Sequence, residues 1–401
     1  MPKLLDNLDK SIQTFNLTEE QELLRKTIRE VAEENFKEKA REIDKSHRFP
    51  KENFDLLAGI GITGLTLPEE YGGGGMNYVS YAIAIEEIAR ICATTSVMLA
   101  VHLSLFSVPV YKFGSQFIRD KYVKELATGK LMGAFCLSEP GNGSDAAAML
   151  TRADDKGEYF ILNGTKAWIT NGSYADLYLV FAQTNAELKH KGITAFIVEK
   201  NMPGVSFGKL EDKLGIRASA TCQVILDKVK VPKENILGNI GDGFKIAMMI
   251  LDSGRIGIAA QAIGIAQASY DLASSYAKTR EAFNKRLLDF QAIRFMLAEI
   301  ACEIEAGRLL TYQAANLYDN SLKFTRQSAE AKLFCSELST KAANKAVQIL
   351  GSYGYTTEYD AERFYRDAKI TEIYEGTSEI HRIVIAQSII KELKLLPSYN
   401  V

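Results

Sequence analysis

The sequence predicts an α+β protein that is mostly helical, with an N-terminal helical domain, a middle antiparallel β domain and a C-terminal four-helix bundle. Apolar residues follow a helical period over residues 1–131, short β-like runs replace them over 132–238, and long helical stripes return over 239–401. A chain of 401 residues is long for one hydrophobic core, so two or three packed domains are expected.

The first domain shows a clear helix start. Thr18-Glu19-Glu20-Gln21 has the form of a capping box, and Leu24, Ile28 and Val31 continue an apolar stripe at helical spacing. A run of four glycines at 72–75 then interrupts the helices. Because no Gly-Lys-Ser or Gly-Lys-Thr follows it, this run predicts a loop rather than a phosphate-binding loop.

The middle domain is predicted to be an antiparallel sheet or a small barrel. Asn163-Gly164 separates the β-like runs 159–162 and 165–169, and this dipeptide in such a place favours a β-hairpin with a tight turn. Three more β-like runs follow, at 177–182, 193–198 and 224–231. No long helices separate them, so a parallel βαβ arrangement is not expected.

The last domain is predicted to be a helix bundle. One buried face is indicated at spacings of three and four residues by Ile293, Met296, Leu297, Ile300 and Ile304. The Ala-rich run 256–273 is apolar over much of its circumference, which indicates burial between other helices or subunits. Four such helices would make a bundle.

The composition excludes several classes of function. The 48 basic and 50 acidic residues give no basic stripe for nucleic acid and no polybasic membrane anchor. Only four histidines occur, none paired at metal-ligand spacing, so no metal site is expected. Five scattered cysteines without C-x-x-C spacing predict buried free thiols in a reducing compartment: Cys92, Cys136, Cys222, Cys302 and Cys335.

The first residues carry acidic side chains and lack both a signal-peptide core and the Arg-rich composition of a transit peptide. No run of about 18 apolar residues is found, so no integral membrane segment is expected. A cytoplasmic protein fits these features. A mitochondrial protein whose presequence had been removed would look the same.

Two short segments carry most of the functional information. In the first, 135–145, small residues would let backbone N–H groups and hydroxyls approach a flat, electron-accepting ring. Gly141-Asn142-Gly143-Ser144-Asp145-Ala146 formally matches a dinucleotide-binding G-x-G-x-x-A motif, but Pro140 precedes it and no βαβ unit follows, so a Rossmann site is not expected. The second segment, 366–380, places Glu375 beside Gly376.

Taken together and in this order, the two segments resemble the two signatures of the acyl-CoA dehydrogenase family, over roughly residues 17–391. The sequence is most similar to the short-chain (butyryl-CoA) and short/branched-chain branches. The resemblance implies an FAD-dependent enzyme, acyl-CoA as substrate and no metal. Without it, Glu375 would pass for one of several surface acids and the single Trp168 for a core residue.

The resemblance places the flavin and pyrophosphate of FAD along the first segment, with Ser138 near flavin N5 and Ser144 touching the substrate. Trp168-Ile169-Thr170 matches a Trp-x-Thr segment that covers one face of the flavin, and strand alternation would put Trp168 and Thr170 on the same face. The residues implied here are Phe135, Cys136, Leu137, Ser138, Glu139, Pro140, Gly141, Asn142, Gly143, Ser144, Trp168, Ile169 and Thr170.

Other residues are implied in the rest of the FAD site. Arg280, Phe283 and Gln291 match a stretch that in relatives reaches across a subunit interface to a neighbour's FAD, which implies a homotetramer built as a pair of dimers. The segment 348–352 matches a Q-x-x-G-G motif on the adenosine half, with Ser352 where a second Gly is usual. The remaining residues are Gln348, Ile349, Leu350, Gly351, Ser352, Thr377, Ser378 and Glu379.

The substrate residues include a helical segment in which Asp252 and Arg255 share one face. That spacing alone would indicate a surface ion pair, whereas the resemblance assigns the segment to acyl-CoA. In the isovaleryl and long-chain branches a Glu base stands at the position of Gly254, so here the base is expected to be Glu375. The implied substrate residues are Ser144, Asp252, Ser253, Gly254, Arg255, Tyr374 and Gly376.

Oxidation of a saturated thioester explains why one carboxylate beside a Gly suffices. An exposed Glu, with a pKa of about 4.3, is too weak a base for the α-proton, so burial must raise its pKa. Hydrogen bonds must hold the thioester carbonyl, and a nearby N–H can supply one. Hydride from the β-carbon then passes to flavin N5.

The expected activity is conversion of a short, straight or 2-methyl-branched acyl-CoA to the trans-2-enoyl-CoA, with electrons passed to an electron-transfer flavoprotein. One alternative is an acyl-CoA oxidase that reduces oxygen, although oxidases usually carry a further C-terminal helical domain. Another is a catalytically silent relative that serves as an assembly subunit. The acyl length is left open, because the apolar pocket floor around 100–113 has a depth that depends on packing.

Overall fold

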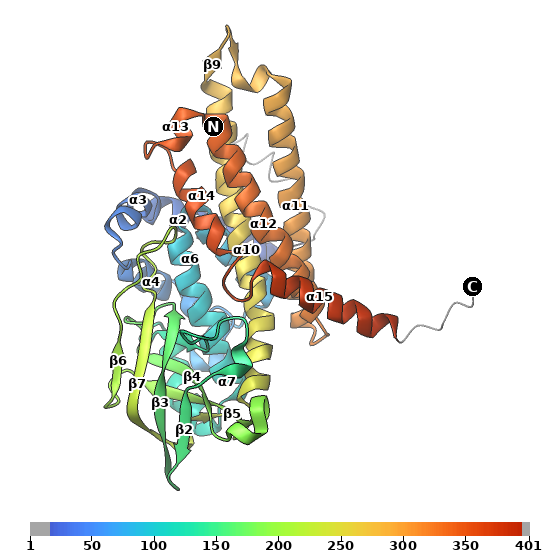
Figure 1. Ribbon diagram of the computed structural model, residues 1–401. Helices are drawn as coiled ribbons and strands as arrows, with labels where there is room; N and C mark the ends of the chain where they lie inside the picture. Colours follow the sequence, from blue (N-terminus) through green and yellow to red (C-terminus); the bar gives the residue numbers. More distant parts are fainter. Residues whose placement is uncertain (1–16, 395–401) are drawn as a thin grey trace, which may run out of the picture.

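The computed structural model describes residues 17–394, and Figure 1 shows a β-sheet packed beside helices from both ends of the sequence. The helices of the N-terminal part are α2 (Glu19–Asn35), α3 (Lys37–Ser46), α4 (Lys51–Gly59), α5 (Tyr78–Ile91), α6 (Ala93–Ala100), α7 (Val108–Phe113), α8 (Gln116–Ile118) and α9 (Lys124–Ala127). The capping box is confirmed, because Thr18 Oγ1 accepts the Gln21 N–H at 3.2 Å and Gln21 Oε1 accepts the Thr18 N–H at 3.0 Å. The glycine run 72–75 is a loop, as expected.

An eight-stranded sheet follows these helices. Its strands are β1 (Gly133–Cys136), β2 (Arg152–Asp155), β3 (Tyr159–Ile169), β4 (Leu177–Gln183), β5 (Ile193–Glu199), β6 (Val205–Phe207), β7 (Cys222–Pro232) and β8 (Ile236–Leu237). They lie in the order β6-β7-β3-β2-β4-β5-β8, with β1 beside β4. Most neighbours are antiparallel, while β1 and β2 each pair with β4 in parallel.

The hairpin predicted at Asn163-Gly164 is wrong, because β3 runs straight through this dipeptide and pairs with β7 on both sides of it. A Cβ on Gly164 would lie 2.4 Å from Thr151 Oγ1, so the glycine allows two backbones to approach closely. The actual turn lies one step earlier, between β2 and β3, where Gly157 has a φ of +87°. Asn163 accepts a hydrogen bond from the backbone N–H of Lys228 at 2.9 Å, across the irregularity in the pairing of the two strands.

The C-terminal part is a bundle of long helices. Its elements are α10 (Gly243–Thr279), β9 (Glu281–Ala282), β10 (Lys285–Arg286), α11 (Gln291–Asp319), α12 (Thr325–Leu350), α13 (Ser352–Tyr355), α14 (Ala361–Ile370) and α15 (Ser378–Leu393). Figure 1 shows α10, α11 and α12 side by side, with the β9–β10 hairpin at their far end and α15 extending away from the body. The buried faces predicted at Leu297, Ile300 and Ile304 and over 256–273 are confirmed.

The core joins these parts. Leu179 and Phe181 of β4 lie in one hydrophobic cluster with Phe106 and Val110 from the segment 93–113. Of the five cysteines, four are buried, whereas Cys302 is exposed. The prediction of a buried thiol is wrong there, because Cys302 lies on the outer face of α11.

Two helices of the described chain, 93–113 and 243–279, are long and apolar enough to cross a membrane by length and composition alone. The most apolar window of the first is 100% buried inside the protein, and that of the second is 78% buried. The core helix of a folded protein passes the same test, so this is weak support for a membrane span.

We expect Gly164→Ala to lower the free energy of unfolding by about 1–3 kcal/mol, because the new methyl group would overlap Thr151 between two paired strands. The matched control is Gly59→Ala at the end of α4, where a Cβ would meet nothing within 4 Å. Thermal unfolding followed by circular dichroism measures both. Equal melting temperatures for the two variants would contradict this account of Gly164.

Candidate active site

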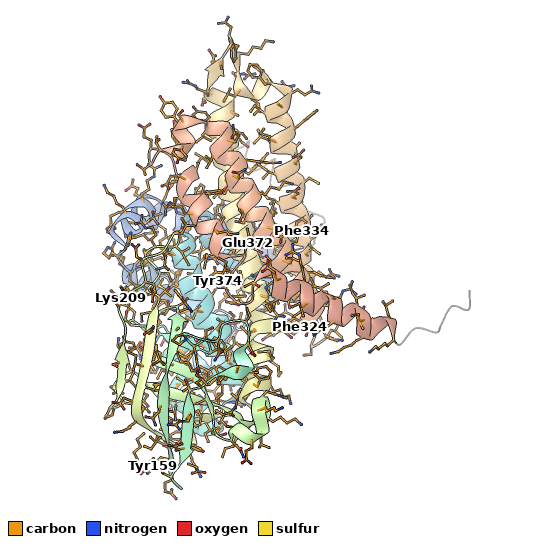
Figure 2. All side chains as sticks on the ribbon, in the orientation of Figure 1. Tyr159, Lys209, Phe324, Phe334, Glu372 and Tyr374 are labelled. Carbon is orange, nitrogen blue, oxygen red and sulfur yellow. The ribbon has the colours of Figure 1, made fainter. Side chains whose placement is uncertain are left out.

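Glu375 lies in the turn between α14 and α15, where the backbone leaves the helical path. Glu375 has a φ of +50° and Gly376 a φ of +99°, so two consecutive residues adopt left-handed conformations. The first is uncommon for a residue with a side chain and indicates a constrained site. Thr377 then caps α15 by accepting the N–H of Ile380, so the turn is held between two helices. Figure 2 labels Glu372 and Tyr374, which precede Glu375 in the chain.

The carboxylate of Glu375 points into the protein against α10. Its Oε2 is buried and has no hydrogen-bond partner among the described residues. A Cβ on Gly254 would lie 2.3 Å from this oxygen and 2.7 Å from Leu105 Cδ2. The missing side chain at Gly254 therefore leaves the space that the carboxylate occupies.

Burial raises the pKa of Glu375 to about 7, against the opposing effect of two nearby positive charges on Lys332 and Arg255. A carboxylate with a pKa near neutrality is matched to proton transfer at physiological pH. Such a shift in a buried group without a hydrogen-bond partner is typical of a functional acid or base.

Arg255 and Asp252 form the predicted ion pair, with Nη1 and Oδ1 2.6 Å apart. The pair is more buried than a surface pair, and Thr325 donates a hydrogen bond to the other oxygen of Asp252 at 2.6 Å. Asp252 and Ser253 line a cavity of about 290 Å³ between α7, α10 and the segment 318–325. This cavity could hold part of an elongated substrate beside α10, the helix that carries Arg255.

The first sequence segment forms a loop between β1 and β2 that a buried ion pair fixes. Glu139 accepts the backbone N–H groups of Leu150 and Thr151 at 2.6 and 2.9 Å, and Lys166 Nζ lies 2.9 Å from its Oε1. Lys166 has no exposed surface and also donates to the carbonyl of Leu137 at 3.2 Å. The loop therefore has one defined shape on the sheet.

Trp168 lies beside this loop, because the next residue back, Ala167, donates its N–H to the carbonyl of Ser138 at 2.9 Å. The alternation argument that joined Trp168 to Thr170 is wrong. Trp168 has a φ of +60° within an irregular part of the β3–β7 pairing, and β3 ends at Ile169. Period-2 geometry therefore does not extend across these residues.

The loop and Trp168 fit a flat cofactor. The indole of Trp168 is 62% exposed although it is the largest apolar side chain of the region, and a Cβ on Gly141 or Gly143 would meet nothing within 4 Å. Cys136 and Leu137, by contrast, are buried in the core, so only their backbone could contact a ligand. Ser138 and Phe135 are half-buried, and Pro140 and Ser144 are exposed.

A second set of the residues implied for the FAD site forms a separate group at the far end of the bundle. Phe283 is 90% exposed on the β9–β10 hairpin, and Arg280 lies 5.8 Å from the ring of Tyr353, next to Ser352. Gln291, Gln348 and Gly351 are exposed in the same region. Of the implied residues in this region, Ile349 and Leu350 are buried.

Within one chain, the exposed residues near the β9–β10 hairpin lie far from the loop 135–144 and from Glu375. Arg280 lies 26 residues beyond Gly254 along the α10 direction, or about 39 Å at the rise of an α-helix. Glu375 lies against Gly254, so the far group is well away from the base. Figure 1 shows the β9–β10 hairpin at the opposite end of the molecule from the sheet.

The start of α15 holds the last implied residues. Ser378 is buried with its Oγ unpartnered among the described residues, Thr377 is half-buried and Glu379 is exposed. The hydroxyl of Tyr374 donates to Gln261 on α10, which fixes the residue before Glu375.

Sequence reasoning missed two buried lysines near these sites. Lys166 lies on β3 behind the loop, and Lys332 lies on α12 with its Nζ 2.7 Å from the carbonyl oxygen of Gly376. Lys332 could have been found from the helical pattern, because it shares the buried face of α12 with small residues such as Ser328, Ala331 and Cys335. Among the described residues, no group of His, Cys, Asp or Glu side chains could hold a metal ion.

Comparison with known proteins identifies the family of this chain. The models of the N-terminal, middle and C-terminal domains of acyl-CoA dehydrogenases match residues 18–130, 134–229 and 241–390. The chain belongs to the acyl-CoA dehydrogenase family. It is 49% identical to the mitochondrial short-chain specific acyl-CoA dehydrogenase of Rattus norvegicus, over 95% of this chain and 93% of that protein.

Two solved structures share the fold of this family member. One is butyryl-CoA dehydrogenase from Megasphaera elsdenii, with a TM-score of 0.93 and 43% identity over 94% of this chain and 100% of that one. The other is a chain from a study of the electron transferring flavoprotein of Acidaminococcus fermentans, with a TM-score of 0.93 and 45% identity over the same shares. The mostly helical fold class with a middle β domain is therefore that of the family.

Proposed function

We propose that the protein is an FAD-dependent dehydrogenase that converts short, straight or 2-methyl-branched acyl-CoA thioesters to trans-2-enoyl-CoA. The single observation that carries the proposal is the buried carboxylate of Glu375, which lies against Gly254 and has a pKa raised by burial to about 7. The similarity to short-chain and butyryl-CoA dehydrogenases supports the choice of short substrates.

In this proposal Glu375 removes the α-proton of the thioester. The unpartnered Oε2 is free to accept it, and the buried surroundings keep water away from the carboxylate. The backbone N–H of Gly376 makes no backbone hydrogen bond within the described residues, so it would be available to the thioester carbonyl, where negative charge develops. FAD held beside this site would supply the acceptor for the hydride equivalent that leaves the β-carbon.

The loop 135–144 and the Trp168–Thr170 segment would hold the flavin and pyrophosphate of FAD. Lys166 and Glu139 hold the shape of that loop, so its backbone donors would need little rearrangement on binding. On the substrate side, Asp252 and Arg255 would position the CoA portion along the cavity beside α10.

The far group of FAD residues supports a homotetramer. Arg280, Phe283 and Gln291 cannot reach the loop of their own chain, so they would complete the FAD site of a neighbouring subunit. The electron acceptor in this proposal is an electron-transfer flavoprotein. The compartment would be the cytoplasm in a bacterium and the mitochondrial matrix in a eukaryote.

Glu375→Gln should retain FAD but lower turnover by several orders of magnitude, because the amide cannot accept the α-proton. In the wild-type enzyme, flavin reduction by butyryl-CoA should slow as the pH falls through about 7, since only the ionised carboxylate acts as a base. Stopped-flow absorbance of the flavin measures both. A Gln variant with a tenth of the wild-type rate would exclude Glu375 as the base.

A variant that carries the carboxylate at position 254 instead of 375 tests the role of the base by recovery of activity. Because a Cβ there would overlap Glu375, Gly254→Glu should restore part of the activity only when residue 375 is also shortened, as in Gly254→Glu/Glu375→Gly. Gly254→Glu combined with Glu375→Gln should remain inactive, since the two side chains compete for the same space.

Substrate preference should peak near four or five acyl carbons and fall sharply by eight. Each buried methylene contributes about 0.8 kcal/mol while there is room, and further carbons must displace packed side chains at roughly 1–3 kcal/mol. A series of kcat/KM values from butyryl-CoA to octanoyl-CoA, with 2-methylbutyryl-CoA and a dye acceptor, tests this. A maximum at octanoyl-CoA would exclude short-chain specificity, and no flavin bleaching by any of them would indicate a silent relative.

Arg280→Ala should lose FAD before it loses helical content, because the residue would serve the neighbour's cofactor rather than its own fold. Flavin absorbance and circular dichroism measure the two effects, and sedimentation gives the oligomeric state. Lys278→Ala, two residues away at the end of α10, is the control and should keep FAD. A monomer with stoichiometric FAD would contradict the shared site.

A further inference from the structure

Lys332 is a buried cation with an unusual set of partners. Its side chain has no exposed surface, and no carboxylate of the described residues lies within 4 Å of its ammonium group. The hydrogen bond that it makes is to the carbonyl oxygen of Gly376, at 2.7 Å. Burying a charge without a direct counter-ion is costly, and burial accordingly lowers the pKa of Lys332 to about 7.

The bond to Gly376 acts on the turn that carries Glu375. Gly376 has a φ of +99° and Glu375 a φ of +50°, so neither residue is held by a regular helix. A Cβ on Gly376 would lie 2.9 Å from His381 Cε1, which shows that α15 packs against the other side of the glycine. The turn therefore lies between Lys332 of α12, which donates a hydrogen bond to it, and His381 of α15, whose ring packs against it.

Several charged and titratable groups surround the carboxylate. Arg255 on α10 is engaged by Asp252 at 2.6 Å, while Tyr81 on α5 and Tyr374 contribute hydroxyls. Burial, with the positive charges of Lys332 and Arg255, lowers the pKa of His381 to about 3, so this ring is neutral near pH 7.

The positive charge of Lys332 favours the ionised form of Glu375 and so opposes the effect of burial on that carboxylate. Burial lowers the pKa of Lys332 to about 7, while the negative charge of Glu375 is the largest effect that opposes this, ahead of Glu372 and Glu337. Conversely, the positive charges of Lys332 and Arg255 both act to lower the pKa of Glu375. The charge of each group therefore favours the ionised form of the other.

We propose that Lys332 is a positioning residue for the base: its ammonium group holds the Gly376 carbonyl, and with it the Glu375–Gly376 turn, and its charge stabilises the ionised carboxylate. Lys332 touches neither substrate nor cofactor in this role, and it acts through Glu375. The inference rests on the proposed function of Glu375.

The test compares the pH dependence of kcat/KM in Lys332→Met, which keeps the unbranched apolar stem and removes the ammonium group with its charge, with that in the wild-type enzyme. Loss of a positive charge near Glu375 makes ionisation of the carboxylate harder, so the acid limb should move to higher pH by about one unit or more. The rate at pH 6.5 should therefore fall about tenfold more than the rate at high pH. Lys332→Arg should keep the limb near its wild-type position.

Lys341→Met is the matched control on the same helix, because Lys341 is exposed and pairs with Glu303 on α11. It should leave the profile unchanged. FAD content and melting temperature are measured for every variant. If Lys332→Met does not yield a flavin-containing enzyme, Lys332→Gln is measured with the same expected shift.

The outcomes separate the two proposals. A wild-type enzyme whose flavin is not reduced by any short acyl-CoA would overturn the proposed function itself. An active wild-type enzyme, together with a neutral Lys332 variant that holds FAD and loses rate equally at every pH, would overturn only the positioning role, since a purely structural defect does not move the acid limb.

Discussion

The structure depends on one constraint: a carboxylate oxygen is buried where none of the described residues donates a hydrogen bond to it. Oε2 of Glu375 has no partner among the described residues, and burial of such a group opposes folding. The chain accommodates it through a left-handed turn at Glu375 and Gly376 and through the absence of a side chain at Gly254. The strained backbone of Glu375 and the missing side chain at Gly254 both serve to place Oε2 of Glu375. Such an arrangement is typical of a functional site.

Two further glycines of α10, beyond Gly254, lie where another helix approaches closely. A Cβ on Gly257 would lie 2.2 Å from the hydroxyl of Tyr81, and one on Gly264 would lie 2.4 Å from the carbonyl oxygen of Glu86. These two positions let α5 pack closely on α10. The same helix therefore leaves room for the base at Gly254 and positions the neighbouring helix, so that the pocket and the core share one element.

Positive charge is distributed around the site in two arrangements. Arg255 is paired with Asp252, whereas Lys332, within residues 17–394, donates to the carbonyl oxygen of Gly376 and to no carboxylate. On the flavin side, Lys166 is paired fully with Glu139 and holds a loop. A paired cation fixes structure, and a cation without a direct counter-ion remains available to influence a neighbouring carboxylate.

The sequence by itself determined the order of helical and β parts, the helix stripes, the capping box at Thr18 and the two motifs that carry the family resemblance, because these depend on local periodicity and short-range chemistry. Only the tertiary structure decided the rest. Asn163-Gly164 reads as a turn until Thr151 is seen packed against Gly164, and Trp168 leaves the strand alternation because the β3–β7 pairing is irregular. Lys332 and Glu375 are 43 residues apart, and no local pattern could reveal that α12 brings its charge to the turn before α15. Proximity of this kind arises from packing between helices, which a single sequence does not encode in its local spacing.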